Sequence, residues 1–342
     1  MSRFTEWSRN FYRTYKPYIF MCLRLLLAGI LLYWVCRNVR FEELEKLSLR
    51  AVIFGFFGGL LCILIQIFLI SLRWRMLLRG QGIEISVFRA ASLTFQGQMC
   101  SLFLPLGAVG GDVLKAAFLT RETDPSKRVE GIATILLDRL IGMMGLFLLV
   151  FVCGACLLPD ILHFTPVLRN LILPLLLACA AGFLAGVVIL YQDLIFRIRI
   201  FAKLLEKADH FARGALSRIL NSVEVCRKDR TRLFTAFLLS FLLLHPLLIF
   251  AGVLVIYGIS GEFPDLISSY FSLGMGNVVS TLPATPGGLG TRDKCIESLL
   301  SAFGTSDTHA ALIPIIYSLG MICAALGGIF FYFRDSFAKK KE

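Results

Sequence analysis

The sequence has little charge for its length. Only 17% of its 342 residues are Asp, Glu, Lys or Arg, whereas 57% are hydrophobic. A soluble domain typically carries about 25% charged residues, so this composition excludes an ordinary soluble enzyme or binding module. It indicates an integral membrane protein.

Histidine is scarce and cysteine is unclustered. The four histidines are far apart, and the ten cysteines are scattered through apolar segments. Cys153 and Cys156 form the one pair at metal-like spacing, and they have neither a partner pair nor a nearby histidine. The sequence therefore predicts no metal site and no cofactor.

The N-terminal sequence also lacks the features of a cleavable signal peptide. The N-terminus is basic, but the apolar run after it is too long for a signal sequence and has no clear small-residue cleavage site. We therefore expect this run to be the first spanning helix. A helix needs about 20 apolar residues to cross a bilayer, and six runs qualify. These runs are 18–36, 51–71, 133–158, 166–190, 233–257 and 309–333.

The net charge of +12 is unevenly distributed. Residues 192–232 hold ten Lys or Arg and five acids, interleaved with Leu, Ile and Phe. This is typical of an amphipathic helix on anionic lipid headgroups rather than of a nucleic-acid-binding segment. By the positive-inside rule, we predict a cytoplasmic linker here, with a cytoplasmic N-terminus (1–17) and C-terminal tail (334–342). The turns without Lys or Arg, which we expect outside, are 158–165, 258–264 and 304–308.

Two further apolar stretches, 86–120 and 265–303, are interrupted by Pro, Gly and charge. The loop charges agree with one threading only if each stretch enters and leaves on the same side, as a re-entrant hairpin. The chain then divides into units 18–158 and 159–333 with the same element order and opposite orientation. The expected fold is an all-α polytopic membrane protein. It has about six spanning helices and two re-entrant broken-helix hairpins, about eight helical segments in all, in two inverted repeats, as in secondary transporters.

The two hairpins share a pattern. An Asp follows a Pro by seven positions in each, as Pro105 to Asp112 and Pro286 to Asp293. Each Asp lies near the start of a second half-helix, where a carboxylate caps free N–H groups. Non-helical backbone at membrane depth is tolerated where it is buried in protein or lines a water-filled cavity. Ordinary turns between short helices are the alternative. The residues predicted to break and hinge the hairpins are Pro105, Gly107, Gly110, Gly111, Pro283, Pro286, Gly287, Gly288 and Gly290.

Charged residues inside the apolar zone are the candidate site. Asp112 and Lys115 have helical i, i+3 spacing and could pair with each other. Asp138 and Arg139 are adjacent, so they point about 100° apart on a helix and each needs a partner elsewhere. Arg292 and Asp293 follow the second glycine cluster. Polar neighbours that suggest a hydrated cavity around these groups are Gln96, Gln98, Asn277, Ser280, Thr281 and Thr285.

Other polar residues have simpler interpretations. Arg73 and Arg75 lie at a helix end, where their side chains are expected to extend to the membrane interface. Gln66 and His245 lie in spanning helices and are expected to form helix–helix hydrogen bonds.

Four segments together resemble a known family. In order, they are SLRWRMLL, LPLGAVGGDVLKAAFLTRE, TILLDRLIGMMG and STLPATPGGLGTRDKCIESLLSAFG. The chain resembles the transmembrane-region family of lysylphosphatidylglycerol synthase/flippases. The resemblance implies a polytopic helical fold with re-entrant segments in two inverted repeats. It also implies translocation of aminoacylated phospholipid from the inner to the outer leaflet, and related members are associated with lipid-linked or polyprenyl-phosphate-linked glycan pathways.

The family pattern can be carried over to individual residues. Asp293 departs from it, since the family often has Glu there. Bifunctional members continue into a soluble aminoacyl-transfer domain, whereas this sequence ends at residue 342, so we expect no synthesis of lysyl lipid by this chain. The family pattern falls on Pro105, Gly107, Gly110, Gly111, Asp112, Asp138, Arg139, Pro286, Gly287, Gly288, Gly290 and Arg292.

The resulting hypothesis is a lipid translocase of the inner or plasma membrane. Arg139, Arg292 and Lys115 would neutralise the phosphate of a phospholipid or polyprenyl phosphate, since guanidinium binds phosphate bidentately. Asp112 and Asp293 would cap half-helices, bind a cationic headgroup or carry a proton. The expected partners are membrane lipids with anionic headgroups.

Two alternatives stay open. One is an ion-coupled small-solute transporter. Another is a non-catalytic membrane subunit of a cell-envelope glycan or lipid pathway, bound to partner enzymes of lipid or glycan synthesis. An intramembrane enzyme is not expected, because the sequence places no nucleophile beside a base.

Overall fold

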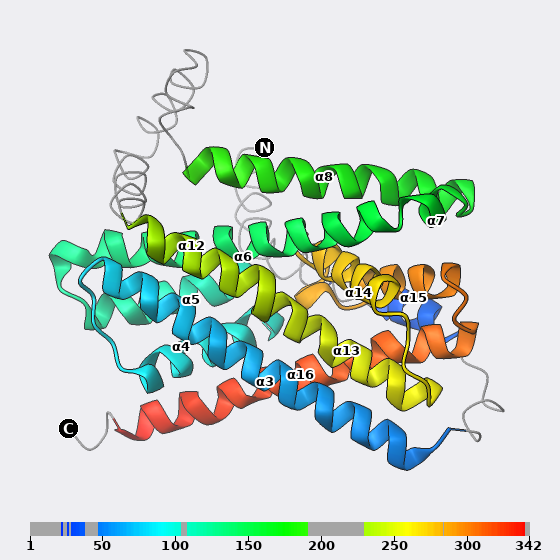
Figure 1. Ribbon diagram of the computed structural model, residues 1–342. Coiled ribbons are helices and arrows are strands. Elements are labelled where there is room, and N and C mark those ends of the chain that lie inside the picture. Colours follow the sequence, from blue (N-terminus) through cyan, green and yellow to red (C-terminus); the bar gives the residue numbers. More distant parts are fainter. Residues whose placement is uncertain are drawn as a thin grey trace, which may run out of the picture.

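The computed structural model describes residues 22, 26, 29–37, 47–103, 108–190, 229–282 and 284–338. Throughout these residues the regular elements are helices (Figure 1). The predicted N-terminal segment 1–17 and most of the linker 192–232 lie outside them.

Five helical stretches are long and apolar enough to cross a membrane. They contain α3 (Leu49–Gly80), α6 (Arg128–Cys156), α8 (Pro166–Leu190), α12 with α13 (Arg230–Leu239 and His245–Ser260), and α16 (Asp307–Ala338). They match five of the six predicted runs. The sixth run, 18–36, is described only in part and is helical over residues 29–36. An integral membrane protein is therefore confirmed, although the number of crossings is not.

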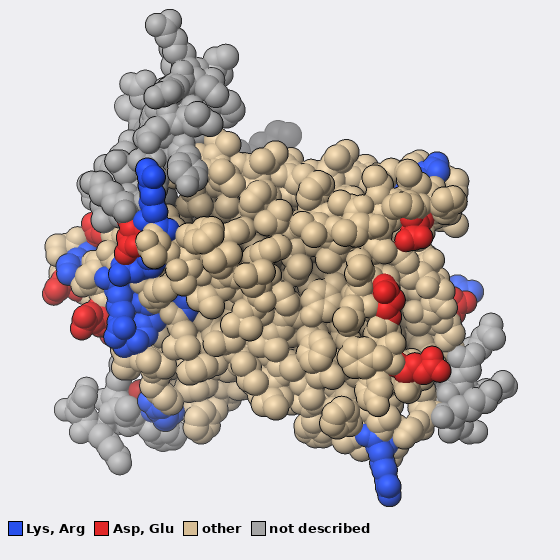
Figure 2. Space-filling view, in the orientation of Figure 1, with Lys and Arg blue, Asp and Glu red and all other residues tan. Residues whose placement is uncertain are grey.

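The surface agrees with this class. In Figure 2, charged side chains gather at the two ends of the molecule, and the broad waist between them carries almost none on the face shown. Large apolar side chains lie on the outside of the long helices, among them Leu177 (68% exposed) and Phe330 (66% exposed). Water disfavours such a surface, whereas lipid accommodates it.

The two interrupted stretches form pairs of shorter helices. The first pair is α4 (Val87–Phe103) with α5 (Ala108–Glu122), and the second is α14 (Leu266–Ser280) with α15 (Thr291–Ala302). Each pair packs side by side and begins and ends at the same end of the molecule, on the left for the first and on the right for the second (Figure 1). Short elements complete the described chain: η1 (Pro125–Lys127), α7 (Leu158–Leu162), the π-helical turn η2 (Ser240–Leu244) and η3 (Pro286–Gly288).

The long helices pack closely where glycine permits it. Helix α3 lies along α13, and a Cβ built on Gly55 would stand 2.5 Å from the Leu254 carbonyl oxygen and 3.2 Å from the Gly258 Cα. Small residues allow such backbone approach between membrane helices. This crossing forms one side of the largest apolar core, which also takes in Ile63, Ile249 and Tyr317.

An ionic cluster at the base of the first hairpin joins its two arms to each other and joins α4 to α16. Arg89 of α4 donates from Nε to Glu122 Oε2 of α5 at 2.9 Å, and its Nη1 donates to Asp335 of α16. Gln96 Nε2 donates to the same Asp335 carboxylate at 2.9 Å. Gln96 thus faces α16, not the predicted cavity.

Candidate functional site

A cavity of about 360 Å³ lies between the two hairpins and helices α3, α6, α13 and α16. Five of the six predicted site residues line it: Asp112, Lys115, Asp138, Arg139 and Arg292. Among the described residues, the charged lining also includes Arg73, so four basic side chains face two acids. The uncharged polar lining includes Gln66, Gln98, Ser101, Asn277, Ser280, Thr281 and Thr285.

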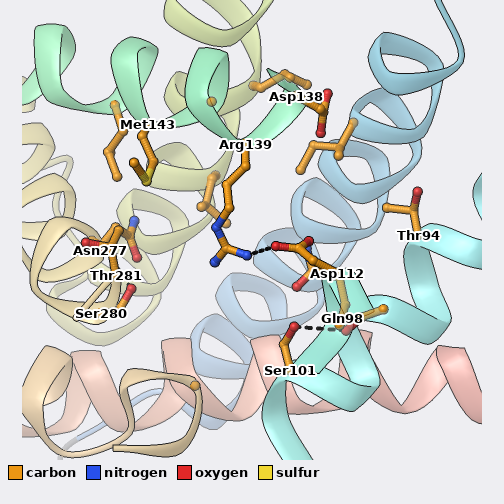
Figure 3. Close-up of a pocket in the computed structure, with 18 of the residues that line it drawn as sticks. Thr94, Gln98, Ser101, Asp112, Asp138, Arg139, Met143, Asn277, Ser280 and Thr281 are labelled. Carbon is orange, nitrogen blue, oxygen red and sulfur yellow. Dashed lines mark hydrogen bonds and ion pairs between the residues drawn. The ribbon is translucent and has the colours of Figure 1, made fainter. Parts of the chain in front are cut away.

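Arg139 occupies the middle of the cavity. Figure 3 shows it projecting from α6 towards Asp112 of the first hairpin, with Asn277, Ser280 and Thr281 of the second hairpin on its other side. Arg139 Nη1 donates to Asp112 Oδ2. The two side chains are 34% and 26% exposed, so this ion pair is accessible to solvent within the cavity.

Asp138 lies on another face of α6 and has a different partner. Arg73 of α3 donates from Nε to Asp138 Oδ1 at 2.8 Å and from Nη2 to the Asp138 carbonyl at 3.1 Å. Its Nη1 donates to Ser240 Oγ in η2. The side chains of Arg73 and Asp138 are only 4% and 10% exposed. The pair therefore joins three elements in the interior.

This arrangement corrects the interpretation of Arg73. The sequence placed it at the membrane interface, whereas it is buried. The sequence contained indirect evidence for a buried partner of Asp138. An Asp in the apolar helix α6 requires a nearby cation, and the adjacent Arg139 points in another direction. Arg75 does lie nearer the helix end, where its Nε donates to the Ile85 carbonyl at 2.7 Å.

Lys115 is directed away from Asp112. Its side chain is buried, and its ammonium lies 4.5 Å from the centre of the Trp74 ring. This is a cation–π geometry. The pairing of Asp112 with Lys115 that the i, i+3 spacing allowed is thus replaced by Asp112 with Arg139.

Of the two Asp residues predicted to cap a half-helix, Asp293 does so, whereas Asp112 is the fifth residue of α5 and pairs with Arg139. The Gly290 N–H donates to Asp293 Oδ2 at 2.8 Å at the start of α15, and Ser318 of α16 donates to Asp293 Oδ1. Arg292 Nη2 donates to Ser318 Oγ at 2.6 Å, and its Nε lies 3.5 Å from Asp293 Oδ1. Asp293 is fully buried behind Arg292, so it supports the cavity wall rather than lining it.

The predicted hinge residues fall into three groups. Pro105, Gly107 and Pro283 lie outside the described residues. Pro286 and Gly288 bound the turn η3, and Gly287 and Gly290 have positive φ angles of 58° and 82° there, so the second hairpin is broken as expected. Their role as hinges stays a prediction.

Gly110 and Gly111 do not interrupt the first hairpin. Helix α5 begins at Ala108, so both lie in its first turn. A Cβ on Gly111 would stand 2.2 Å from the Gly97 carbonyl oxygen of α4. Gly111 is needed for close packing of the two arms, which a search for helix breaks in the sequence does not detect.

The end of α4 in the first hairpin contacts the turn η3 of the second hairpin. A Cβ on Gly287 in η3 would stand 2.6 Å from Leu102 Cδ1 near the end of α4. The two interrupted segments, nearly two hundred residues apart in the chain, therefore contact each other beside the cavity.

His245 forms the expected helix–helix hydrogen bond. Its Nε2 donates to the Gly142 carbonyl of α6 at 2.8 Å. His245 also lines the cavity, which the sequence did not predict.

Comparison with known proteins agrees with this architecture. The sequence profile described as the lysylphosphatidylglycerol synthase TM region matches residues 21–327. The UPF0104 membrane protein PH1989 of Pyrococcus horikoshii is similar over nearly the whole length. It is 22% identical over 330 residues, which cover 92% of this chain and 96% of that protein.

Proposed function

Because the chain belongs to the lysylphosphatidylglycerol synthase TM region family, we propose that it is a lipid translocase of the cell membrane. It moves a phosphate-bearing lipid between the leaflets, with the headgroup in the cavity and the acyl or prenyl chains in the bilayer. The observation that carries this proposal is the solvent-accessible ion pair of Arg139 with Asp112 between the hairpins.

The pair provides a mechanism of headgroup capture. A lipid phosphate is an alternative anion for Arg139, and guanidinium binds phosphate in a bidentate manner. When the phosphate replaces the Asp112 carboxylate, α5 loses its ionic contact with α6. Binding of the headgroup therefore favours movement of the first hairpin. A ligand shifts such an equilibrium only through its different affinity for the two states, and the exchanged ion pair supplies that difference.

The packing supports inverted repeats as part of the proposal. Helices α3 and α13 occupy corresponding places in the two units, and they pack against each other. The first hairpin packs on α16 of the second unit through α4, and the second hairpin packs on α6 of the first unit through α14. Reciprocal contacts of this kind are what a pseudo-twofold axis in the membrane plane would produce.

The charged ends support the orientation that we propose. Arg79 ends α3, Lys127 and Arg128 precede or begin α6, and Arg230 begins α12. The end of α3 and the starts of α6 and α12 lie at the end of the molecule where the C-terminus emerges (Figure 1). With basic loops on the cytoplasmic side, this end and both termini are cytoplasmic.

The test is exchange of phospholipids and a short polyprenyl phosphate between the leaflets of proteoliposomes. Wild-type protein is compared with Arg139→Gln and, as a matched control, with Arg169→Gln on α8, which is outside the cavity lining. We expect exchange with wild type and the control and at least a tenfold loss with Arg139→Gln. Undiminished exchange by Arg139→Gln would remove Arg139 from the site. Uptake of a small solute without lipid exchange would favour the ion-coupled carrier instead.

A further inference from the structure

His245 has a ring nitrogen that its structural role does not use. Its Nε2 donates to the Gly142 carbonyl, and because a carbonyl only accepts, Nε2 carries a proton. In the neutral ring Nδ1 is then an acceptor. Nδ1 is buried and has no hydrogen-bond partner among the described residues. Buried polar atoms are nearly always paired, so this one requires an explanation.

The backbone around His245 is irregular at this point. The π-helical turn Ser240–Leu244 ends at His245, whose N–H donates to the Ser240 carbonyl. The same turn presents Ser240 Oγ to Arg73. A π turn inside a helix often marks a functional site. Here it places His245 in the wall of the cavity, between the two long segments α12 and α13.

The position of His245 relative to Arg139 is defined by α6. Gly142, to which the ring is bonded, follows Arg139 by three residues, a rise of about 4.5 Å along the helix. Arg139 and His245 both line the same cavity. His245 is therefore bonded to α6 within one turn of Arg139.

We propose that His245 is a specificity-determining residue, whose Nδ1 accepts a hydrogen bond from a hydroxyl or ammonium group on the headgroup alcohol. This inference rests on the proposed function and names its substrate class: phospholipids whose headgroup has an O–H or N–H donor beyond the phosphate. A quaternary ammonium headgroup has no such donor and leaves Nδ1 unpaired. A site with a buried hydrogen-bonding group discriminates strongly against a ligand that lacks the matching group. An apolar pocket discriminates less.

The experiment measures exchange of three fluorescent lipids in proteoliposomes of one composition. Phosphatidylglycerol supplies a hydroxyl donor, phosphatidylethanolamine an ammonium donor, and phosphatidylcholine neither. We expect wild type to move at least one of the first two about tenfold faster than phosphatidylcholine, since each unpaired buried group typically costs that order of affinity. The faster of the two identifies the donor.

Two substitutions separate recognition from structure. The amide nitrogen of His245→Gln is placed to replace Nε2 and keep the bond to Gly142, without an acceptor at the Nδ1 position. The amide oxygen of His245→Asn is placed to replace Nδ1 and keep the acceptor, without the Gly142 bond. We expect His245→Gln to fold and to lose the preference, and His245→Asn to retain part of it.

The outcomes distinguish the two proposals. Equal exchange of all three lipids by wild type, or an unchanged preference in His245→Gln, would overturn the role of His245 and leave the translocase intact. No exchange of any lipid by folded wild-type protein would overturn the translocase, and this inference with it.

Discussion

At the scale of single residues, the two ion pairs of α6 differ in environment. The side chains of Arg73 and Asp138 are almost fully buried in the cavity wall, whereas those of Arg139 and Asp112 are partly exposed to the cavity. Adjacent residues of one helix thus serve two purposes. The first pair joins helices, and the second is the pair that the proposed function uses.

This difference predicts losses of stability of different size. Arg73→Ala leaves Asp138 buried without its cation, and removing one partner of a buried pair costs about 3–5 kcal/mol. Arg139→Ala removes a partly exposed partner and should cost about 1 kcal/mol or less. Thermal unfolding in detergent measures both variants. Equal destabilisation would mean that the exposed pair is as structural as the buried one.

The sequence was most informative about single residues where chemistry demands a partner. It predicted that Asp138 and Arg139 would each pair elsewhere, and that Asp293 would cap a half-helix; both are confirmed. It did not identify Arg73 as the partner of Asp138, because spacing along the chain says nothing about which helices meet. The unpaired Nδ1 of His245 could not be predicted from the sequence for the same reason.

At the scale of elements, the hairpins are held by close packing as much as by charge. Gly328 of α16 lies against α4, where an added Cβ would stand 2.5 Å from the Phe95 carbonyl oxygen. Its neighbour Gly327 has more room, with its nearest contact at 3.5 Å. The two glycines form a natural pair for testing the contact.

We expect Gly328→Ala to destabilise the protein and Gly327→Ala to be neutral or stabilising. Overpacking typically costs about 1–3 kcal/mol, whereas Ala in a helix gains about 0.5–1 kcal/mol over Gly where space allows. Unfolding midpoints of the two variants in one detergent provide the comparison. Similar midpoints would show that α16 and α4 separate easily.

Helix boundaries were predicted well where apolar runs are long and poorly where glycine has a packing role. Five runs became five long helices because their length alone suffices. Gly110 and Gly111 were taken for a break, yet they begin α5. The π turn at Ser240–Leu244 lies just before Pro246, whose missing N–H interrupts the helical hydrogen bonds there, but the apolar run alone did not predict it.

At the scale of the whole molecule, the orientation in the membrane is directly testable. Asp124, between the first hairpin and α6, and Glu262, between α13 and the second hairpin, are both exposed. The loops that carry them, between α5 and α6 and between α13 and α14, lie near opposite ends of the molecule (Figure 1). The proposed orientation puts the first in the cytoplasm and the second outside.

Cysteine labelling measures this. In a background with the exposed native cysteines replaced by alanine, we expect Glu262→Cys to react with an impermeant maleimide in intact cells. Asp124→Cys should react only after permeabilisation. The reverse pattern would invert the topology, and labelling of both from one side would contradict the number of crossings between them.

The contact between Leu102 of α4 and Gly287 of η3 has an electrical consequence. A cavity lined by six charged side chains, if open to water on both sides at once, would conduct ions. Each elementary charge that crossed would dissipate about 2.3 kcal/mol per 100 mV of membrane potential. Leu102 against Gly287 is an apolar closure at the side of this cavity. In the proposed translocase, this contact would help to keep the membrane electrically insulated while a lipid headgroup crosses.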